Sequence, residues 1–230
     1  MRQSYFIVAA VLVLSSFLST DAKAISLTDI DFFVGTGPNQ VAMVLDWADG
    51  KDPLIWGYRW DGVATARDMF HDIVAADTRL FAKVSNQFSF GEFIYGIGYD
   101  RDADGFVLSD STDFVNGLFE GSATDGATAT DPDDSYREGF DFGFWGFFIA
   151  SGNPYDGGVW GFANFGISDT VLVNDQFLGF SFAPDLVGDV PGEPATVPSA
   201  SPAPIPEPGT IIMLGFSVMG LMLRRRVFVS

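Results

Sequence analysis

The sequence predicts a mainly β fold of the α+β class: a single antiparallel, sandwich-like β-rich domain with one prominent helix near residues 65–76. Three observations lead to this prediction. Short apolar and aromatic runs recur between residues 30 and 182, and Gly, Asn, Asp and Pro separate them, as in strands joined by turns. A single segment changes to helical periodicity. The chain has 24 Phe, 5 Trp and 6 Tyr but no cysteine, so aromatic side chains must supply the core.

Residues 1–24 have the pattern of a secretory signal peptide. Arg2 supplies the positive charge, residues 5–18 are apolar, and Ala22 and Ala24 form a small-residue cleavage site around Lys23. We expect export by the general secretion machinery and cleavage after Ala24. An uncleaved N-terminal anchor is the alternative interpretation.

Residues 25–190 have the size of one extracellular β-rich domain with its own core. Between residues 25 and 206 the formal charge is −21, with 7 Lys or Arg against 28 Asp or Glu. Nucleic acids and anionic lipids require a cationic surface, so the charge argues against both as partners. A strongly negative charge is compatible with binding of calcium or of cationic partners, or it simply keeps the protein soluble.

Strands are expected at several apolar runs. Residues 54–60 alternate, and residues 30–34 and 41–47 flank a turn. The aromatic parity switches within residues 87–99, which predicts a β-bulge at Gly91 and Glu92. Further strands are expected at residues 114–119, 139–151, 158–167, 170–173 and 177–182.

The helix is expected to begin at Thr65, because Thr65 and Asp68 form a capping-box pattern. The residues that follow the helical period, with a restart at Asp77, are Ala66, Met69, Phe70, Ile73, Leu80 and Val84. His71, the only histidine, falls on this helix. One histidine makes no ordinary histidine-based metal site, and no nucleophile or orienting partner is apparent for it.

The strongest chemical motif in the domain is the acidic loop of residues 100–105, with the pattern D-x-D-x-D-G. Oxygen ligands at alternate positions of a tight turn suit Ca²⁺. The pattern then departs from the EF-hand, because Ser111 stands where a bidentate Glu is expected. The candidate calcium ligands are Asp100, Asp102, Asp104 and Asp110. The alternative is a solvated turn, followed by a long acidic loop at residues 111–138.

No catalytic residue and no cofactor other than calcium is predicted, because the chain has no G-x-S-x-G, H-E-x-x-H or P-loop motif. Trp145, Trp160 and Phe162 suit either core packing or sugar stacking. The predicted role is therefore non-enzymatic. The alternatives are an enzyme or a carbohydrate-binding module acting on a polysaccharide, or a small-ligand module with an apolar pocket beside the helix.

The C-terminal region changes composition twice. Residues 191–205 are a Pro-rich segment that predicts an extended linker. Pro206, Glu207 and Pro208 then precede an apolar run, for which we expect a transmembrane helix at residues 210–223. The run is short for a bilayer, but the three following arginines, Arg224, Arg225 and Arg226, extend it and favour a cytoplasmic C-terminus.

In these residues, 206–230, the sequence resembles the PEP-CTERM proteins, the substrates of the bacterial sorting enzyme exosortase. The resemblance rests on the Pro-Glu-Pro tripeptide, the apolar helix and the arginine cluster in that order. It implies recognition and cleavage near Pro206-Glu207-Pro208 in a Gram-negative bacterium that makes exopolysaccharide. The protein is then expected in the inner membrane transiently, with its N-terminal domain in the periplasm, and finally at the cell surface or in the extracellular matrix.

Overall fold

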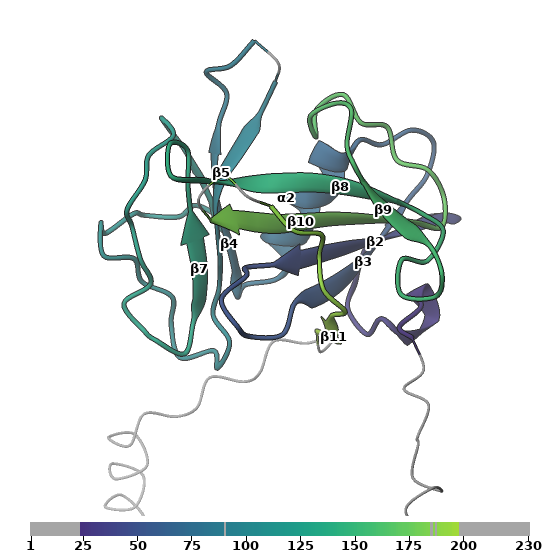
Figure 1. Ribbon diagram of the computed structural model, residues 1–230, viewed down its shortest axis with the longest axis horizontal. Coiled ribbons are helices and arrows are strands. Elements are labelled where there is room, and N and C mark those ends of the chain that lie inside the picture. Colours follow the sequence, from purple (N-terminus) through teal and green to yellow (C-terminus); the bar gives the residue numbers. More distant parts are fainter. Residues whose placement is uncertain (1–23, 90, 185, 187, 198–230) are drawn as a thin grey trace, which may run out of the picture.

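The computed structural model describes residues 24–89, 91–184, 186 and 188–197. Its elements form two β-sheets and one α-helix (Figure 1). In chain order they are η1 (Leu27–Asp29), β1 (Phe33–Gly35), β2 (Asn39–Asp46), β3 (Leu54–Trp60), α2 (Ala66–Ala76), β4 (Leu80–Ser85), β5 (Phe93–Tyr99), β6 (Leu118–Glu120), β7 (Ser135–Glu138), β8 (Gly143–Ser151), β9 (Val159–Phe162), β10 (Gln176–Pro184) and β11 (Ala195–Thr196).

The larger sheet has the strand order β1-β3-β2-β10-β8-β9, and β11 also pairs with β3. The pairs β2–β3, β10–β8 and β8–β9 are antiparallel, whereas β1–β3, β10–β2 and β11–β3 are parallel. The sheet is therefore mixed, which corrects the expectation of an antiparallel arrangement. A parallel pair needs a crossover connection, and the long segment between β2 and β10 supplies one for these two strands.

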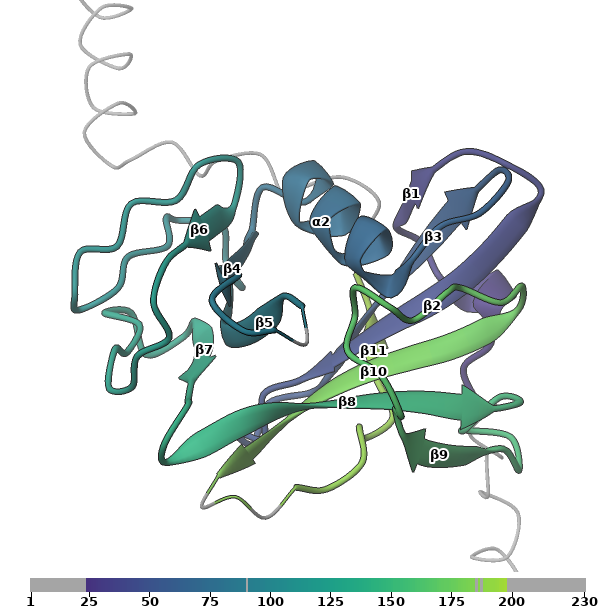
Figure 2. The same ribbon diagram turned by 90° about the horizontal axis from the view of Figure 1, so that it is seen from above.

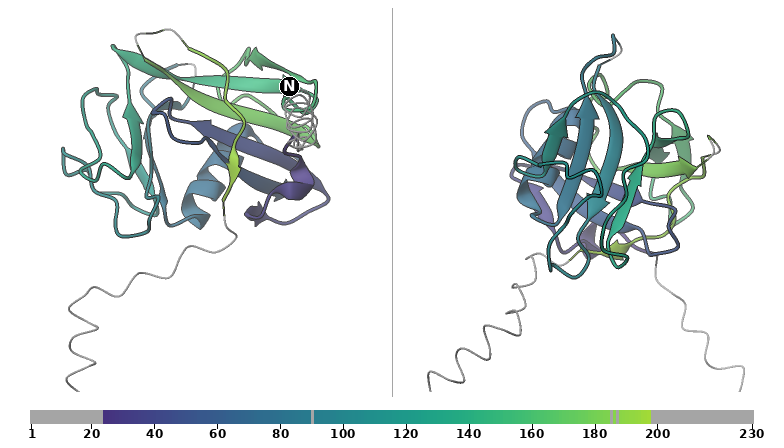
Figure 3. Two further views of the ribbon diagram at one scale, coloured as in Figure 1. Left: turned by 60° about the horizontal axis from the view of Figure 1, so that its bottom comes forward. Right: turned by 90° about the vertical axis from the view of Figure 1, so that its left-hand side faces the viewer.

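The smaller sheet has the order β6-β4-β5-β7 and is also mixed, because β6 runs parallel to β4. Figure 3 shows this sheet at one end of the molecule, and in Figure 1 its strands cross the direction of β8 and β10. Together with α2 it covers one face of the larger sheet (Figure 2). The main core lies between these layers and contains Met43, Trp56, Phe70, Ile97 and Phe180, all almost fully buried.

Helix α2 begins as the sequence predicts. The Thr65 hydroxyl accepts a hydrogen bond from Asp68 N at 3.2 Å, and Asp68 Oδ2 accepts one from Thr65 N at 2.9 Å, which completes the capping box. Met69, Phe70 and Ile73 are buried on the inner face of the helix. The amphipathic pattern thus marks a packing face.

The predicted continuation of the helical pattern is wrong. The helix ends at Ala76, and Leu80 and Val84 belong to strand β4. Asp77 fixes this change of direction, because its Oδ2 accepts from Trp56 Nε1 at 3.0 Å and its Oδ1 accepts from Arg79 N at 3.1 Å. The spacing of positions 73, 80 and 84 places them on one face of a helix. Positions 80 and 84 are an even number of positions apart, so they also lie on one face of a strand.

The bulge predicted at Gly91 and Glu92 is also misplaced. Strand β5 begins only at Phe93, and the register with β4 shifts between Lys83 and Val84, which leaves Tyr95 as the extra residue. The aromatic parity does change in this region, because the chain enters β5 only at Phe93. The bulge itself lies two residues inside the strand, at Tyr95.

The described domain continues past residue 190. Gly192 N donates to Asp46 Oδ2 at 2.9 Å, β11 pairs with β3, and Val197 is only 1% exposed. The first residues of the predicted linker therefore pack on the domain. Residues 1–23 of the signal peptide, the transmembrane helix 210–223 and the sorting residues lie outside the described residues. Within the described part, no helix has the length and apolarity to cross a bilayer.

Candidate metal centre and aromatic pocket

The sheet register brings two acidic segments together at one end of the smaller sheet. Tyr99, the last residue of β5, pairs with Ser135, the first residue of β7. Asp100 directly follows one strand and Asp134 directly precedes the other, so the antiparallel pairing makes them neighbours although 33 residues separate them. The acidic loop of residues 100–105 therefore lies beside Asp134, which is not part of the D-x-D-x-D-G motif.

One carboxylate oxygen from each of Asp100, Asp102 and Asp134 lies within 4.8 Å of the others. Asp100 Oδ1 accepts a hydrogen bond from Ala103 N at 2.6 Å, and its Oδ2 accepts one from Gly105 N at 3.1 Å. These bonds hold the loop in a tight turn. Gly105 has φ +124°, a conformation that favours glycine and explains the last position of the motif.

Asp134 is the least exposed of the three, at 5%. Its Oδ1 accepts a hydrogen bond from Arg101 N at 3.2 Å, but its buried Oδ2 receives none from the described residues. Burial raises the pKa of Asp134 to about 7, and the negative charge of Asp100 acts in the same direction. The sequence motif missed Asp134 because it falls in an acidic, turn-rich run, and the following short strand was not predicted.

The basic side chains near this cluster donate to backbone oxygens and to Ser135, not to the clustered carboxylates. Arg101 Nε donates to Ser135 Oγ at 2.7 Å, and its Nη2 donates to the Asp52 carbonyl oxygen at 2.9 Å. Lys51 Nζ donates to the backbone oxygens of Pro132, Asp133 and Asp134. Among the described residues, none of the three clustered carboxylates forms an ion pair with a Lys or Arg side chain.

The other two predicted ligands do not join the cluster. Asp104 is exposed, and the neighbouring Asp102 carboxylate raises its pKa. Asp110 Oδ2 lies 2.6 Å from Lys83 Nζ, in a separate group of charges that includes Glu138. The structure thus brings Asp100 and Asp102 together, places Asp104 within electrostatic range, and pairs Asp110 with a lysine.

A second group of charges joins α2 to β5. His71 Nε2 lies 2.6 Å from Glu92 Oε1, and Arg67 Nη2 lies 3.2 Å from Glu92 Oε2. Burial alone would raise the pKa of Glu92, but the hydrogen bonds and charges of His71 and Arg67 outweigh it and lower the pKa. His71, the only histidine of the sequence, thus has a carboxylate partner that the sequence pattern did not indicate.

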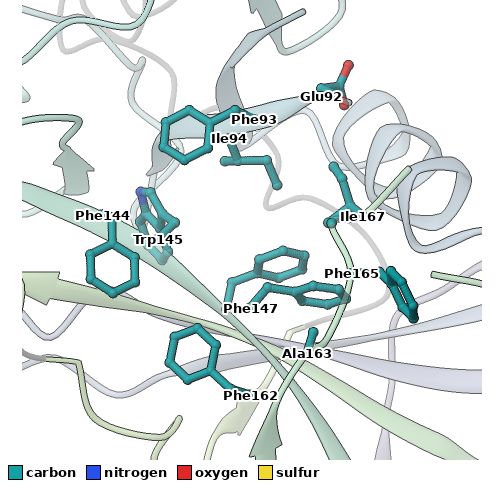
Figure 4. Close-up of a pocket in the computed structure, with 12 residues that line it drawn as sticks. Glu92, Phe93, Ile94, Phe144, Trp145, Phe147, Phe162, Ala163, Phe165 and Ile167 are labelled. Carbon is teal, nitrogen blue, oxygen red and sulfur yellow. The ribbon is translucent and has the colours of Figure 1, made fainter. Parts of the chain in front are cut away.

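An aromatic pocket of about 170 Å³ lies next to Glu92, between β5 and the strands β8, β9 and β10. Figure 4 shows its aromatic walls and the Glu92 carboxylate at one edge. The lining residues are Glu92, Phe93, Ile94, Phe144, Trp145, Phe147, Phe162, Ala163, Phe165, Gly166, Ile167 and Phe180. Arg67 N donates to the Ile167 carbonyl oxygen at 3.0 Å, so one wall of the pocket is tied to the start of α2.

The three aromatic residues proposed for sugar stacking divide between core and surface. Trp145 is 6% exposed, and its Nε1 donates to the Arg137 carbonyl oxygen at 3.2 Å. Trp160 is partly buried and packs against a smaller apolar cluster that contains Ala42, Ile55 and Phe177. Phe162 is 60% exposed at the rim of the pocket. Core packing thus accounts for the two tryptophans, and Phe162 alone presents a large open surface.

The comparisons with known proteins concern the C-terminal end. The family model of the PEP-CTERM protein-sorting motif matches residues 204–226, which include the Pro-Glu-Pro tripeptide and the three arginines. No curated protein and no solved structure matches the chain. The chain therefore carries a PEP-CTERM protein-sorting motif, which indicates an exported protein that exosortase processes and sorts to the cell envelope.

Proposed function

We propose that the protein is a non-enzymatic component of the cell surface or of the exopolysaccharide matrix. The observation that carries this proposal is the position of the sorting motif. The described domain ends at Val197, and the motif begins at residue 204, so a folded acidic domain is joined closely to a processing signal. This organisation suits a protein whose task is to be displayed outside the cell.

The use of the buried charges supports the non-enzymatic part of the proposal. Lys83 pairs with Glu138, Arg79 with Asp77, and His71 with Glu92, each joining elements or turns of the fold. Each of these pairs therefore has a structural use, because it joins parts of the fold.

The sorting step is tested by mass spectrometry of the cell-surface fraction, in strains with and without exosortase. We expect surface protein without Arg224, Arg225 and Arg226 when the enzyme is present. Replacing Pro206, Glu207 and Pro208 together by Ala should leave uncut protein in the membrane, whereas Pro198→Ala with Pro202→Ala should not. Surface protein that keeps all three arginines in both strains would contradict the proposal.

The matrix role is tested separately with the exopolysaccharide of the host. We expect the purified protein to co-sediment with the polysaccharide and to release no new reducing ends on long incubation. Release of reducing ends would instead identify the protein as an enzyme that acts on exopolysaccharide. Absence of both co-sedimentation and cleavage would remove the polysaccharide as a partner.

The aromatic pocket favours a second candidate function, binding of a small neutral apolar molecule. The pocket volume of about 170 Å³ is that of a single ring, and an engineered apolar cavity of about 150 Å³ is known to bind benzene. Phe162 and Phe165 at the rim are 60% and 66% exposed, so the pocket opens to solvent. The Glu92 carboxylate is already bound by His71 and Arg67, which leaves no free charge for an ionic ligand.

This second function is tested by titrating the protein with benzene or indole and following the pocket resonances by NMR. Ala163→Leu, which fills the pocket, should abolish the shifts. Ala75→Leu on the exposed side of α2 is the control and should keep them. Equal shifts in both variants would place binding elsewhere.

A further inference from the structure

The acidic cluster of Asp100, Asp102 and Asp134 has no use in the proposed function, and its chemistry points to a ligand of its own. We propose that these three carboxylates bind one Ca²⁺ ion, with Asp134 from outside the loop motif as a ligand in place of Asp110. The proposal does not depend on sorting, on the matrix or on the aromatic pocket.

The first argument is the state of Asp134. A buried carboxylate normally accepts several hydrogen bonds, because an unpaired buried oxygen loses its solvation without compensation. Asp134 is 95% buried, yet its Oδ2 accepts no hydrogen bond from the described residues, while one of its oxygens lies within 4.8 Å of Asp100 and Asp102. A cation at this point supplies the missing partner.

The second argument is electrostatic. Three carboxylates at such short separations repel one another, and the nearby acidic side chains of Asp104 and Asp131 add to the negative field. The side chains of Arg101 and Lys51 lie nearby but donate to backbone oxygens and to Ser135, and among the described residues they form no ion pair with the three carboxylates. A divalent cation relieves this repulsion directly.

The donor set selects the kind of cation. The cluster offers only oxygen ligands, which suit hard cations, whereas zinc and copper sites use His or Cys. Mg²⁺ requires near-ideal octahedral geometry, whereas Ca²⁺ accepts six to eight oxygens in a flexible arrangement. Three carboxylates on two loops, completed by water and backbone oxygens, fit Ca²⁺ better. With few protein ligands the affinity should be in the range of about 0.1–1 mM that extracellular modules show.

The test is calorimetric titration of the full-length protein, purified in detergent and freed of metal by chelation. We expect one Ca²⁺ per chain with a dissociation constant of about 0.1–1 mM, and at least tenfold weaker binding of Mg²⁺. Saturating Ca²⁺ should raise the melting temperature by about 3–10 °C. Tb³⁺, which replaces Ca²⁺ at oxygen sites, should show emission sensitised by Tyr99 next to Asp100.

Two variants identify the ligands. Asp134→Asn should weaken Ca²⁺ binding at least tenfold, whereas Asp133→Asn removes the same charge from an exposed neighbour and should keep the affinity within about twofold. Asp102→Asn changes an exposed residue, so it is expected to fold normally and to lose binding as well. It therefore decides the question even where Asp134→Asn fails to fold.

The competing explanation is that Asp134 is simply a protonated carboxyl group in a buried turn. In that case the wild-type protein shows no heat, no shift in melting temperature and no Tb³⁺ emission up to about 10 mM metal, and the proposal is wrong. Equal Ca²⁺ affinity in wild type, Asp134→Asn and Asp102→Asn would also overturn it, since binding would then lie elsewhere in the acidic chain.

Discussion

Lys83 Nζ lies 2.8 Å from Glu138 Oε2, although Lys83 is on β4, Glu138 is on β7 and strand β5 runs between them. Gly96 of β5 makes this possible, because it pairs with Lys83 on one side and with Glu138 on the other. With no side chain at Gly96, the lysine reaches across the middle strand. Both charged side chains are almost fully buried, at 2% and 1% exposure.

We expect Lys83→Met to destabilise the fold by about 3–5 kcal/mol, because it leaves Glu138 as a buried charge without its cation. Combining Lys83→Met with Glu138→Leu should recover a large part of this loss. Chemical denaturation measures both. The exposed Arg59, which lies over the Phe33 ring, provides the control: Arg59→Met should cost under about 1 kcal/mol. A Lys83→Met variant as stable as this control would contradict the account.

Gly96→Ala should destabilise the domain by about 1–3 kcal/mol, because the added methyl group would lie 2.6 Å from Tyr136 Oη and 3.2 Å from Lys83 Cβ. Thermal unfolding measures the effect. Gly161→Ala on the edge strand β9 is the matched control, since its nearest neighbour would lie at 3.7 Å. Similar losses of stability in the two variants would mean that steric contact of the added methyl group at residue 96 is not the cause.

Thr65→Ala should lower the free energy of unfolding by about 1 kcal/mol, because it removes the hydroxyl that accepts from Asp68 N at the start of α2. Circular dichroism during urea unfolding measures the change. Thr36→Ala, at an exposed position between β1 and β2, should stay within about 0.5 kcal/mol of the wild type. If Thr65→Ala is equally neutral, the backbone bonds from Ala66 and Arg67 to the segment at residues 167–170 hold the helix start alone.

Glu92 makes stability depend on pH. Its pKa is lowered from 4.5 in the folded protein, so the unfolded chain binds a proton first as the pH falls. The stability contributed by Glu92 is complete above about pH 4.5 and is lost as the pH falls through the lower, folded pKa. Hydrogen bonds from His71 and Arg67 are the cause, so their loss accompanies the change.

Glu92→Gln should therefore flatten the dependence of the unfolding free energy on pH between about 3 and 6, and should destabilise most at the upper end. Unfolding curves over that range measure it, with Glu120→Gln on the exposed edge strand as the control. An unchanged slope in Glu92→Gln would show that other carboxylates dominate acid unfolding.

Local chemistry made the helix and many strands predictable. The Thr65 and Asp68 capping box, and the alternation along residues 54–60, each depend on neighbours within a few positions. The error at Leu80 and Val84 has the same origin, because their spacing fits both a helix and a strand. The hydrogen bonds of the Asp77 carboxylate to Trp56 and Arg79 decide between them, and the former joins distant parts of the chain.

Pairings between distant segments could not be inferred in this way. The parallel contact of β10 with β2 joins residues more than a hundred positions apart. The candidate metal centre shows the same limit, because Asp100 and Asp102 follow a local motif, whereas Asp134 arrives through the register of β5 with β7. A short strand after an acidic run carries too little periodicity to be recognised.

The parallel pairing of β11 with β3 has a mechanical consequence. The chain leaves the described domain at Val197, directly after Ala195 and Thr196 have paired with Leu54 and Ile55, and Val197 itself is buried in the main core. Any tension from an attachment on the C-terminal side therefore acts first on β11, which is hydrogen-bonded in the sheet, and on Val197, which is packed in the core. Drag on the displayed domain would be resisted by the same interactions that fold it.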